Sequence, residues 1–314
     1  MNTPIKATGL LSCFRLLVAA SFFTVASMPV AHAQDAAALK AHHAALSERL
    51  ASNAFQRPLV LESSESAGAL KGDIYALIEQ PYAVVGPALQ GVAQWCDILI
   101  LHLNVKQCRA SSQAPGPTSG ATAGRTANDR LILNIGRKSD QPPADAYRFD
   151  FAYTVVAARA DYLHVALNAE QGPLGTRHYR VVLEVVALDA RRSFVHLSYA
   201  YSYGVAAQVA MQGYLATAGR DKVGFSIVGT RANGQPEYIG GMRGVIERNT
   251  MRYYLAIESF LGALSAPLPQ QIDQRLNAWH TSVERYPLQL HELERGEYLD
   301  MKRREIQRQR EPSG

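Results

Sequence analysis

The stretch of sequence that decides the fold runs Phe194-Val195-His196-Leu197-Ser198-Tyr199-Ala200-Tyr201-Ser202-Tyr203. Its alternation places Val195, Leu197 and three tyrosines on one face of a strand, and Phe194, His196 and three small residues on the other. A tyrosine side chain combines a large apolar ring with a hydroxyl at its tip. The row therefore predicts either the wall of a cavity that holds an amphipathic ligand, or a tyrosine-rich packing face whose hydroxyls are satisfied within the protein.

Strand patterns precede this stretch and form the body of the protein. Turn-forming residues at 141–143, 160–161, 172–175 and 189–191 separate the strands. Parallel pairing needs a crossover of about a dozen residues or more, and these connections are shorter, so the pattern predicts an antiparallel meander. The expected strands cover residues 131–136, 148–157, 162–169, 177–188 and 193–203.

Further elements lie on both sides of this meander. Upstream, an amphipathic helix is expected over 34–55, two strands over 59–65 and 73–78, and a helix from Pro81 toward Trp95, followed by a loop over 110–128. Downstream, helical spacing of apolar residues predicts a helix within 204–218 and a long helix over 245–264. A strand is expected over 222–229, and a helix-rich segment, broken near Pro287, over 271–309.

The order of these elements resembles the START-like, helix-grip (SRPBCC) superfamily, and together with the N-terminal pattern of residues 1–33 it is similar to an exported bacterial family. The resemblance covers about residues 58–265, and the segment Gly72-Asp73-Ile74-Tyr75-Ala76-Leu77-Ile78, with Pro81, Val85, Leu89 and Trp95, is similar to the opening of its polyketide cyclase and lipid-transfer members. It implies an α+β fold in which a curved antiparallel sheet wraps around a long C-terminal helix, with extra helices at both ends. It also implies a cavity between the sheet and that helix.

The resemblance sets the expected central domain and its ligand, and residue patterns on either side of it set the other segments. We expect a signal peptide over 1–33, an N-terminal helix over 34–57, a helix-grip domain over 58–265 and a helical extension over 266–314. The predicted function is non-enzymatic binding of a lipid or other hydrophobic small molecule, with no cofactor. The candidate ligand-binding residues are Leu197, Tyr199, Tyr201 and Tyr203 of the strand, and Tyr253 and Ile257 of the long helix.

The N-terminus has the pattern of a cleavable signal peptide. Lys6 and Arg15 are its positive charges, an apolar run covers 16–26, and Ala31-His32-Ala33 is the small-x-small pattern that precedes cleavage. A membrane-spanning helix needs about 20 apolar residues, and this run is shorter. We therefore expect cleavage after Ala33 and a mature protein in the periplasm or outside the cell, without a transmembrane segment.

The cysteines agree with export. Cys13 lies in the expected signal peptide, which leaves Cys96 and Cys108, and a close pair in an oxidising compartment favours a disulfide. A metal or redox pair is the alternative, with His102 between the two cysteines. The composition, 47% hydrophobic and 19% charged, is that of a globular protein, and a net charge of +5 is too small to indicate nucleic-acid binding.

Motifs for catalysis and metal binding are weak. The sequence contains neither a Gly-x-Ser-x-Gly elbow nor a His-Glu-x-x-His helix, so no catalytic residue is predicted. The alternative function is a cavity-based hydrolase or cyclase that uses polar residues such as His196, Glu184 or Arg180. His164, His178 and His196 occur on successive expected strands and could meet at a metal, although separate histidines on strands are more often satisfied individually, and no metal site is predicted.

Two remaining segments allow two interpretations each. The turn Gly240-Gly241 before the long helix, with Arg243, is either an anion-binding helix start or a tight turn with structural ion pairs. The C-terminal segment alternates aromatic and charged residues, among them Trp279, Tyr298 and Met301. It either docks on the domain or offers helices to a protein partner, which would suit an envelope scaffold protein.

Overall fold

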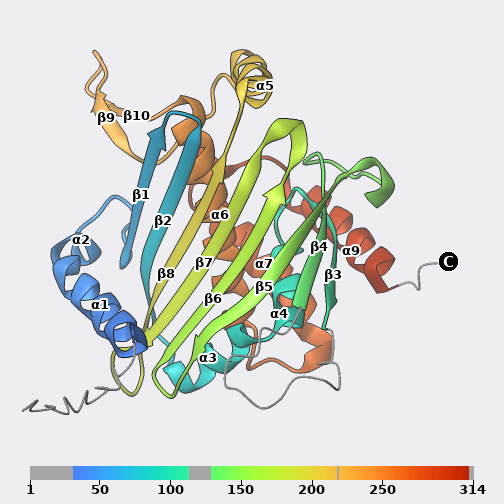
Figure 1. The fold of residues 1–314 in the computed structure, drawn as a ribbon. Helices are drawn as coiled ribbons and strands as arrows, with labels where there is room; N and C mark the ends of the chain where they lie inside the picture. The colour runs from blue at the N-terminus through green and yellow to red at the C-terminus, as the bar shows by residue number, and fades with distance from the viewer. Residues whose placement is uncertain (1–30, 113–128, 218, 311–314) are drawn as a thin grey trace, which may run out of the picture. The chain divides into compact units, whose positions relative to one another are not determined.

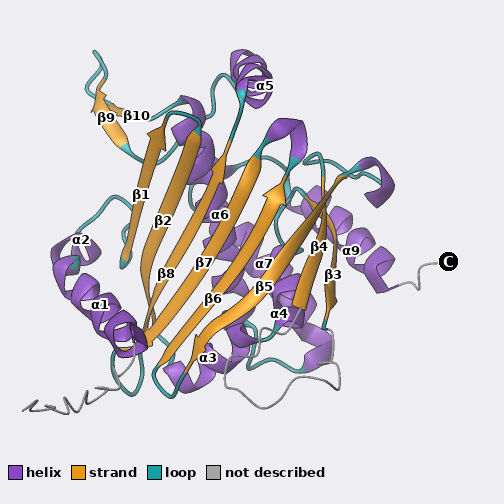
Figure 2. Cartoon of the chain, in the orientation of Figure 1, coloured by secondary structure: helices purple, strands orange, loops and turns teal. Residues whose placement is uncertain are grey.

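The computed structural model describes residues 31–112, 129–217 and 219–310. Their centre is an eight-stranded antiparallel sheet with the strand order β1-β2-β8-β7-β6-β5-β4-β3 (Figures 1 and 2). The strands are β1 (Leu59–Ser66), β2 (Ala69–Ile78), β3 (Val105–Ser111), β4 (Asp129–Ile135), β5 (Tyr147–Ala158), β6 (Tyr162–Gln171), β7 (Arg177–Ala187) and β8 (Ser193–Ser202). The meander predicted from the sequence forms β4 to β8.

Two features of the sheet differ from expectation. Strand β3, which pairs with β4 and contains Cys108, was not predicted from the sequence. The loop expected over 110–128 lies mostly outside the described residues, and its first two residues belong to β3. The sheet is completed by a long-range pairing, because β2 hydrogen-bonds along its full length to β8, with Ile74 opposite Leu197.

The long helix α6 (Gly241–Gly262) lies against the inner, concave face of the sheet (Figure 1). Its closest approach is to β2 at Gly72, where an added Cβ would lie 2.3 Å from Oγ1 of Thr250. Helices α3 (Tyr82–Gln90) and α4 (Val92–Leu99) close the same side of the sheet. They form the single helix expected after Pro81, interrupted at Gly91, whose backbone is extended.

The outer face of the sheet is partly covered by α1 (Ala31–Ala45) and α2 (Ser47–Ala51). Their apolar residues, including Leu39 and Leu50, form a second core cluster with Tyr75 and Phe194 of the sheet. The signal peptide expected over 1–33 lies almost wholly outside the described residues, and Ala31 to Ala33 belong to the first turn of α1.

The C-terminal segment forms α7 (Leu268–Val283), α8 (Pro287–Leu290) and α9 (Arg295–Arg310). Helix α7 packs on α6, and α9 packs on α7 and β3. Trp279 stacks on Tyr298 with ring centroids 4.9 Å apart, and both side chains are buried, as is Met301. These residues therefore belong to the protein's own core and are not available to a partner.

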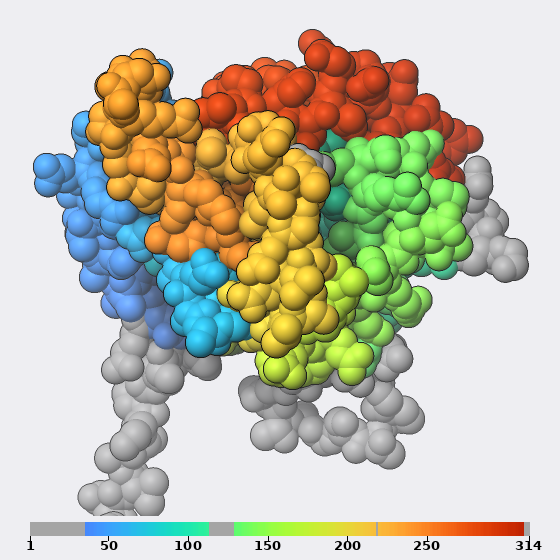
Figure 3. All heavy atoms as spheres, turned by 90° about the horizontal axis from the view of Figure 1, so that it is seen from above, coloured from blue at the N-terminus to red at the C-terminus, as the bar shows by residue number. Residues whose placement is uncertain are grey.

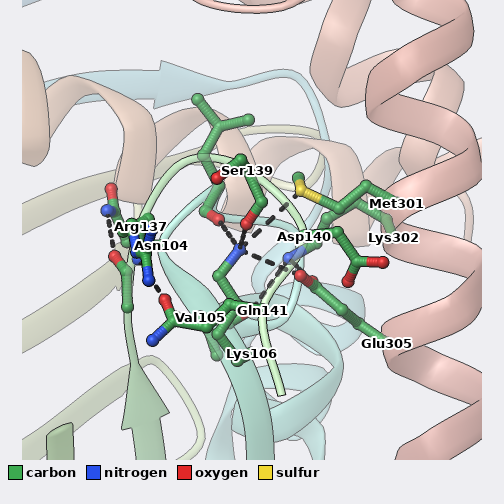
Figure 4. Close-up of polar contacts among 12 residues, drawn as sticks. Asn104, Val105, Lys106, Arg137, Ser139, Asp140, Gln141, Met301, Lys302 and Glu305 are labelled. Carbon is green, nitrogen blue, oxygen red and sulfur yellow. Dashed lines mark hydrogen bonds and ion pairs between the residues drawn. The ribbon is translucent and has the colours of Figure 1, made fainter. Parts of the chain in front are cut away.

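A buried ionic cluster fixes α9 to β3 (Figure 4). Lys106, Lys302 and Glu305 have no exposed side-chain surface, and Glu305 lies 2.9 Å from the ammonium of Lys106 and 2.6 Å from that of Lys302. Lys302 also donates to the carbonyls of His102 and Val105. Burial lowers the pKa of Lys302 to about 8 despite the neighbouring carboxylate.

The segment between β8 and α6 corrects one prediction and agrees with another. Helix α5 (Val205–Ala216) interrupts the chain after β8 as expected. The strand expected over 222–229 is wrong in extent, because only β9 (Ile227–Thr230) forms, paired with β10 (Pro236–Tyr238) in a separate hairpin. The amides of Phe225 and Ser226 donate to the carboxylate of Glu247 in α6, and therefore join no sheet.

Candidate ligand-binding cavity

A cavity of about 380 Å³ lies between the concave face of the sheet and α6. This volume is within the range of small-molecule sites, about 300–1,000 Å³. Most of its walls are apolar or aromatic. The lining includes Trp95, Ile98 and Leu99 of α4, Leu133 and Ile135 of β4, Phe149 and Phe151 of β5, Leu167 of β6, Tyr179 and Val181 of β7, Leu197, Tyr199 and Tyr201 of β8, and Val245, Asn249, Tyr253 and Ile257 of α6.

Simple periodicities place these side chains. Every second residue of a strand faces the same side, so Leu197, Tyr199 and Tyr201 point together from β8. On α6 the lining residues recur every four positions, as in Asn249 and Tyr253, because side chains at i and i+4 share one face of a helix. The cavity is thus the space between two faces whose patterns can be read in the sequence.

Five of the six candidate ligand-binding residues line this cavity: Leu197, Tyr199, Tyr201, Tyr253 and Ile257. Tyr203 is not among the lining residues. It follows the last residue of β8, and its hydroxyl donates to the carboxylate of Glu65 at 2.9 Å. The alternation of the strand predicted its face, but the strand ends before the tyrosine row does.

The tyrosines form a connected aromatic wall. Tyr199 meets Tyr253 edge to face at 5.3 Å between centroids, and Tyr179 stacks on Tyr201 at 5.0 Å. Tyr179 donates to Thr176, but within the described ranges no hydrogen bond is made by the hydroxyls of Tyr199, Tyr201 or Tyr253. Burial raises the pKa of these three hydroxyls, so they stay protonated. The cavity therefore has neutral hydroxyl groups that are not satisfied by the protein.

One polar residue of the cavity, His102, was missed as a ligand-binding candidate. Its ring stacks on Tyr253 at 4.7 Å between centroids, and its Nδ1 accepts a hydrogen bond from the backbone amide of Asn104. Burial, with the nearby charge of Arg252, holds its pKa well below the ordinary value, so the ring is neutral. Its proton is then on Nε2, which is buried and has no hydrogen-bond partner in the described structure.

Helix α5 and a one-turn helix, η2 (Pro173–Gly175), cover one end of the cavity. Ala207, Met211 and Tyr214 of α5 contribute to the lining, while Val205 and Val209 are 77% and 61% exposed. Figure 3 shows a hollow between α5, in yellow, and the green segment that contains β4. Because both elements contribute lining residues, the hollow leads toward the cavity.

The predicted disulfide is confirmed. Cys96 of α4 is bonded to Cys108 of β3, with 5.2 Å between the Cα atoms. Trp95, next to Cys96, lines the cavity and donates its indole N–H to the carbonyl of Leu89. The covalent link therefore holds α4, one wall of the cavity, to the edge of the sheet.

The residues considered for a cavity-based enzyme lie elsewhere. His196 and Glu184 project from the outer face of the sheet, where the imidazole lies 2.8 Å from Glu184 and 2.9 Å from Asp73. Arg180 is exposed on the same face. The interpretation of these residues as cavity groups is wrong, because the alternation that points Leu197 inward points His196 outward.

The histidines do not gather at a metal site. His164 and His196 lie on either side of Glu184 in the sheet register, but His178 is at the start of β7, 3.9 Å from Glu170. Within the described ranges no group of three or more His, Cys, Asp or Glu side chains is arranged to hold a metal ion. The described helices also include none that combines the length and apolar character needed to span a membrane.

The turn at Gly240-Gly241 is structural. The guanidinium of Arg243 donates to the carbonyl and hydroxyl of Ser63 in β1, so it is engaged within the protein. Glu247 accepts hydrogen bonds from Ser63, Phe225 and Ser226. Together these contacts anchor the start of α6 to the edge of the sheet.

Comparisons with known proteins give structural neighbours only. No protein-family model and no curated protein matches the chain. A protein from Arthrobacter aurescens is 15% identical, with 66% of this chain and 92% of that chain covered and a TM-score of 0.31. A START superfamily protein from Mycobacterium smegmatis is 10% identical, with 52% and 88% covered and a TM-score of 0.30. Norcoclaurine synthase from Thalictrum flavum, in complex with dopamine and hydroxybenzaldehyde, is 10% identical, with 52% and 81% covered and a TM-score of 0.31.

The chain's own topology identifies the fold. The element order β2, α3, α4, β3 to β8 and α6 is the order that the resemblance implied, and β2 pairs with β8 so that one continuous sheet faces α6. Strand β1, helices α1 and α2, helix α5 and helices α7 to α9 are additions to this order. The chain has a START-like, helix-grip fold.

Proposed function

We propose that this protein is a non-enzymatic binder of a lipid or another hydrophobic small molecule. The observation that carries the proposal is the cavity of about 380 Å³, which has apolar and aromatic walls and three tyrosine hydroxyls without partners in the described structure. An apolar enclosure gains from burying hydrocarbon, and its few polar groups orient the ligand. Its volume suits one chain or one small ring system.

We further propose that the protein works outside the cytoplasm. The sequence pattern of residues 1–33 supports export, and so does the Cys96–Cys108 disulfide, because disulfides persist mainly in oxidising compartments. Mass spectrometry of the protein isolated from the periplasmic fraction tests this directly. The expected mature chain begins at Gln34 and has no free thiol. A chain that retains residues 1–33 and has free thiols would contradict export.

The first test of binding is the analysis of what the protein carries. The mature protein is purified from the periplasm without detergent, extracted with organic solvent, and the extract is examined by mass spectrometry. A lipid or other apolar molecule in stoichiometric amount is the expected result. The extracted protein is then titrated with a fluorescent fatty acid and with a panel of phospholipids. An empty extract together with no binding of any probe would refute the proposal.

A further inference from the structure

The polar end of the cavity lies beside a group of buried cations. Arg248 and Arg252 of α6 are 3% and 2% exposed. Burial disfavours their charged form and lowers the pKa of both guanidinium groups. Lys138 and Lys222 come from loops that meet α6 at the same place. The carboxylates that face these four cations are Glu292 and Glu247.

The two carboxylates do not balance the four cations. Glu292 lies 2.5 Å from Lys138, 2.9 Å from Arg252 and 3.7 Å from Lys222, so three cations share it. Glu247 is saturated by hydrogen bonds from Ser63, Phe225 and Ser226. Within the described ranges Arg248 makes no ion pair, and its guanidinium donates to the carbonyl of Val223. The cluster therefore has an excess of positive charge.

This excess reaches the cavity through Tyr214. The Tyr214 hydroxyl lies 3.5 Å from the ammonium of Lys138, which also sits over the tyrosine ring at 5.8 Å from the centroid, and Tyr214 lines the cavity. Asn249, one position after Arg248, lines the cavity as well, and its side chain makes no hydrogen bond in the described structure. His102 also lines the cavity, and its Nε2 is buried without a hydrogen-bond partner in the described structure.

Much of the remaining lining is apolar. Trp95, Phe151 and Leu167 are buried and present only carbon surface or, in the case of Trp95, an N–H that is already bonded to Leu89. The cavity therefore combines hydrocarbon walls with polar groups, and two of these, Tyr214 and Asn249, lie next to the cation cluster. A neutral ligand would leave that charge uncompensated, whereas an anionic head would offset it in a region where water screens little.

From this arrangement we infer that the ligand is a single-chain amphiphile with an anionic head, a carboxylate or a phosphate. Its head lies at Tyr214 and Asn249, within the field of Lys138 and Arg248, and its hydrocarbon chain lies against Trp95, Phe151 and Leu167. The inference rests on the proposed function and specifies its ligand. A volume of about 380 Å³ is near the lower end for ligand sites, which favours one chain over the two chains of a phospholipid.

The test compares three probes that share one hydrocarbon chain. The mature protein, extracted to remove any resident ligand, is titrated with dodecanoate, dodecyl phosphate and dodecanol in competition with a fluorescent fatty acid. We expect at least one of the anions to bind about tenfold or more tightly than the alcohol, since a hydrogen bond to a charged group is stronger than one to a neutral group. The comparison of dodecanoate with dodecyl phosphate tells a carboxylate head from a phosphate head.

A matched pair of variants locates the anion. Lys138→Gln removes the cation that contacts Tyr214, and Lys40→Gln removes an exposed cation of α1 that pairs with Asp161, outside the cluster. We expect Lys138→Gln to weaken binding of the anion about tenfold and to leave the alcohol unchanged, while Lys40→Gln changes neither. Circular dichroism confirms that both variants are folded.

The outcomes separate the two proposals. If dodecanol binds as tightly as both anions, the cavity binds hydrocarbon without selecting charge, which overturns this inference and leaves the proposed function intact. If Lys40→Gln weakens anion binding as much as Lys138→Gln does, the head does not lie at Tyr214, which also overturns it. If no probe binds and the organic extract is empty, the proposed function itself fails.

Discussion

At the scale of single residues, the outer face of the sheet holds a charge network that the cavity does not use. His196 lies between Asp73 and Glu184, and Tyr162 donates to Glu184 at 2.5 Å. Burial disfavours every charged form here, but the hydrogen bonds from His196 outweigh it and lower the pKa of both carboxyl groups. The same bonds raise the pKa of His196. All three groups are therefore charged together in the folded protein between about pH 4.5 and 6.5.

This network predicts a dependence of stability on pH. Because its folded pKa is raised, His196 contributes stability below its ordinary pKa of 6.5 and loses it as the pH rises through the folded value. The carboxylates of Asp73 and Glu184, whose ordinary pKa values are 3.8 and 4.5, contribute stability above those values. This contribution is lost as the pH falls through their lower folded pKa values. The contribution is therefore greatest between about pH 4.5 and 6.5. We expect His196→Gln to reduce the free energy of unfolding most in that window and least at about pH 9.

Urea unfolding of wild type and variant at several pH values checks this prediction. The difference between the two proteins is the quantity to compare, since Lys302 and other groups titrate in both. His178→Gln is the matched control, because His178 is exposed on the same sheet and lies 3.9 Å from Glu170. A constant difference across the pH range for His196→Gln would mean that the imidazole acts through its shape and not through its charge.

Gly72 permits the close approach of α6 to β2. An added Cβ would lie 2.3 Å from Oγ1 and 3.2 Å from Cβ of Thr250, a fully buried residue whose hydroxyl donates to the carbonyl of Ile246. We expect Gly72→Ala to lower the free energy of unfolding by about 1–3 kcal/mol through overpacking. The cost is expected to shrink in a Thr250→Ala background, as measured by a double-mutant cycle.

A control for Gly72→Ala is available in α5. Gly213 has no atom within 4 Å of an added Cβ, so Gly213→Ala is expected to be neutral or stabilising. If Gly72→Ala costs the same with and without Thr250, the loss comes from the strand backbone and not from contact with α6.

For single residues, the sequence predicted which face of an element a side chain occupies better than which distant residues it contacts. Alternation placed Leu197, Tyr199 and Tyr201 on one face, because a strand's period is fixed by its geometry. Neither His102 nor Tyr214 could be recognised as a cavity residue, since each reaches the cavity from a segment whose position depends on contacts distant in sequence. Tyr203 was included because the pattern continues past the point where β8 ends.

At the scale of elements, the ionic cluster beneath α9 contains more positive than negative charge. Lys106 and Lys302 share the single carboxylate of Glu305, and all three side chains are fully buried. Removal of a partner from a buried ion pair leaves a charge without compensation, at a cost of about 3–5 kcal/mol. Glu305→Gln is therefore expected to destabilise the protein strongly at neutral pH.

The pH dependence of that loss distinguishes charge from packing. The pKa of Lys302 is already lowered to about 8, and without Glu305 it is expected to fall further, so the folded variant loses its proton more readily than the unfolded chain does. Stability of Glu305→Gln is then expected to recover relative to wild type as the pH rises from that lower pKa to about 8, above which Lys302 has lost its proton in both folded proteins. Chemical unfolding measures this, with exposed Glu297→Gln as the control. A deficit independent of pH would show that lost packing and hydrogen bonds dominate.

Elements with strong periodic patterns were predicted well, and those defined by tertiary contacts were not. The five strands of the meander and helix α6 repeat their apolar residues over long stretches. Strand β3 contains Lys106, Gln107 and Arg109 and has no such alternation. It forms because it pairs with β4 and contacts α9, and neither contact can be read from its own sequence. Val223 and Phe225 alternate as in a strand, but the amides of Phe225 and Ser226 donate to the carboxylate of Glu247.

At the scale of the whole molecule, the sheet closes by pairing β2 with β8, which are separated by more than a hundred residues. No local pattern reveals that pairing, and the resemblance implied only a curved sheet around a long helix, without specifying which strands pair. The resemblance did not predict how α5, η2 and the loop cations close one end of the cavity, since these segments are additions to the shared order. The fold could therefore be expected from the sequence, whereas the amphipathic character of the cavity required the structure.

The last prediction concerns the cavity as a property of the whole fold. Val181 lines the cavity from β7 and is 9% exposed, and its neighbour Val182 is 8% exposed on the opposite face of the sheet. Val181→Phe adds bulk to the empty volume, so we expect ligand binding to weaken at least tenfold while stability without ligand changes by less than about 1.5 kcal/mol. Val182→Phe adds the same bulk outside the cavity and is expected to bind as wild type does.

Thermal unfolding with and without the fluorescent fatty acid measures both effects. Ligand at about 100 times its Kd stabilises a folded protein by about 2.7 kcal/mol, so the Tm of wild type and of Val182→Phe is expected to rise, and that of Val181→Phe to remain nearly unchanged. A rise in all three proteins would place the ligand outside the cavity, because a site elsewhere on the molecule is indifferent to the volume beside Val181. A rise confined to the two proteins with an open cavity would tie binding to the space between the sheet and α6.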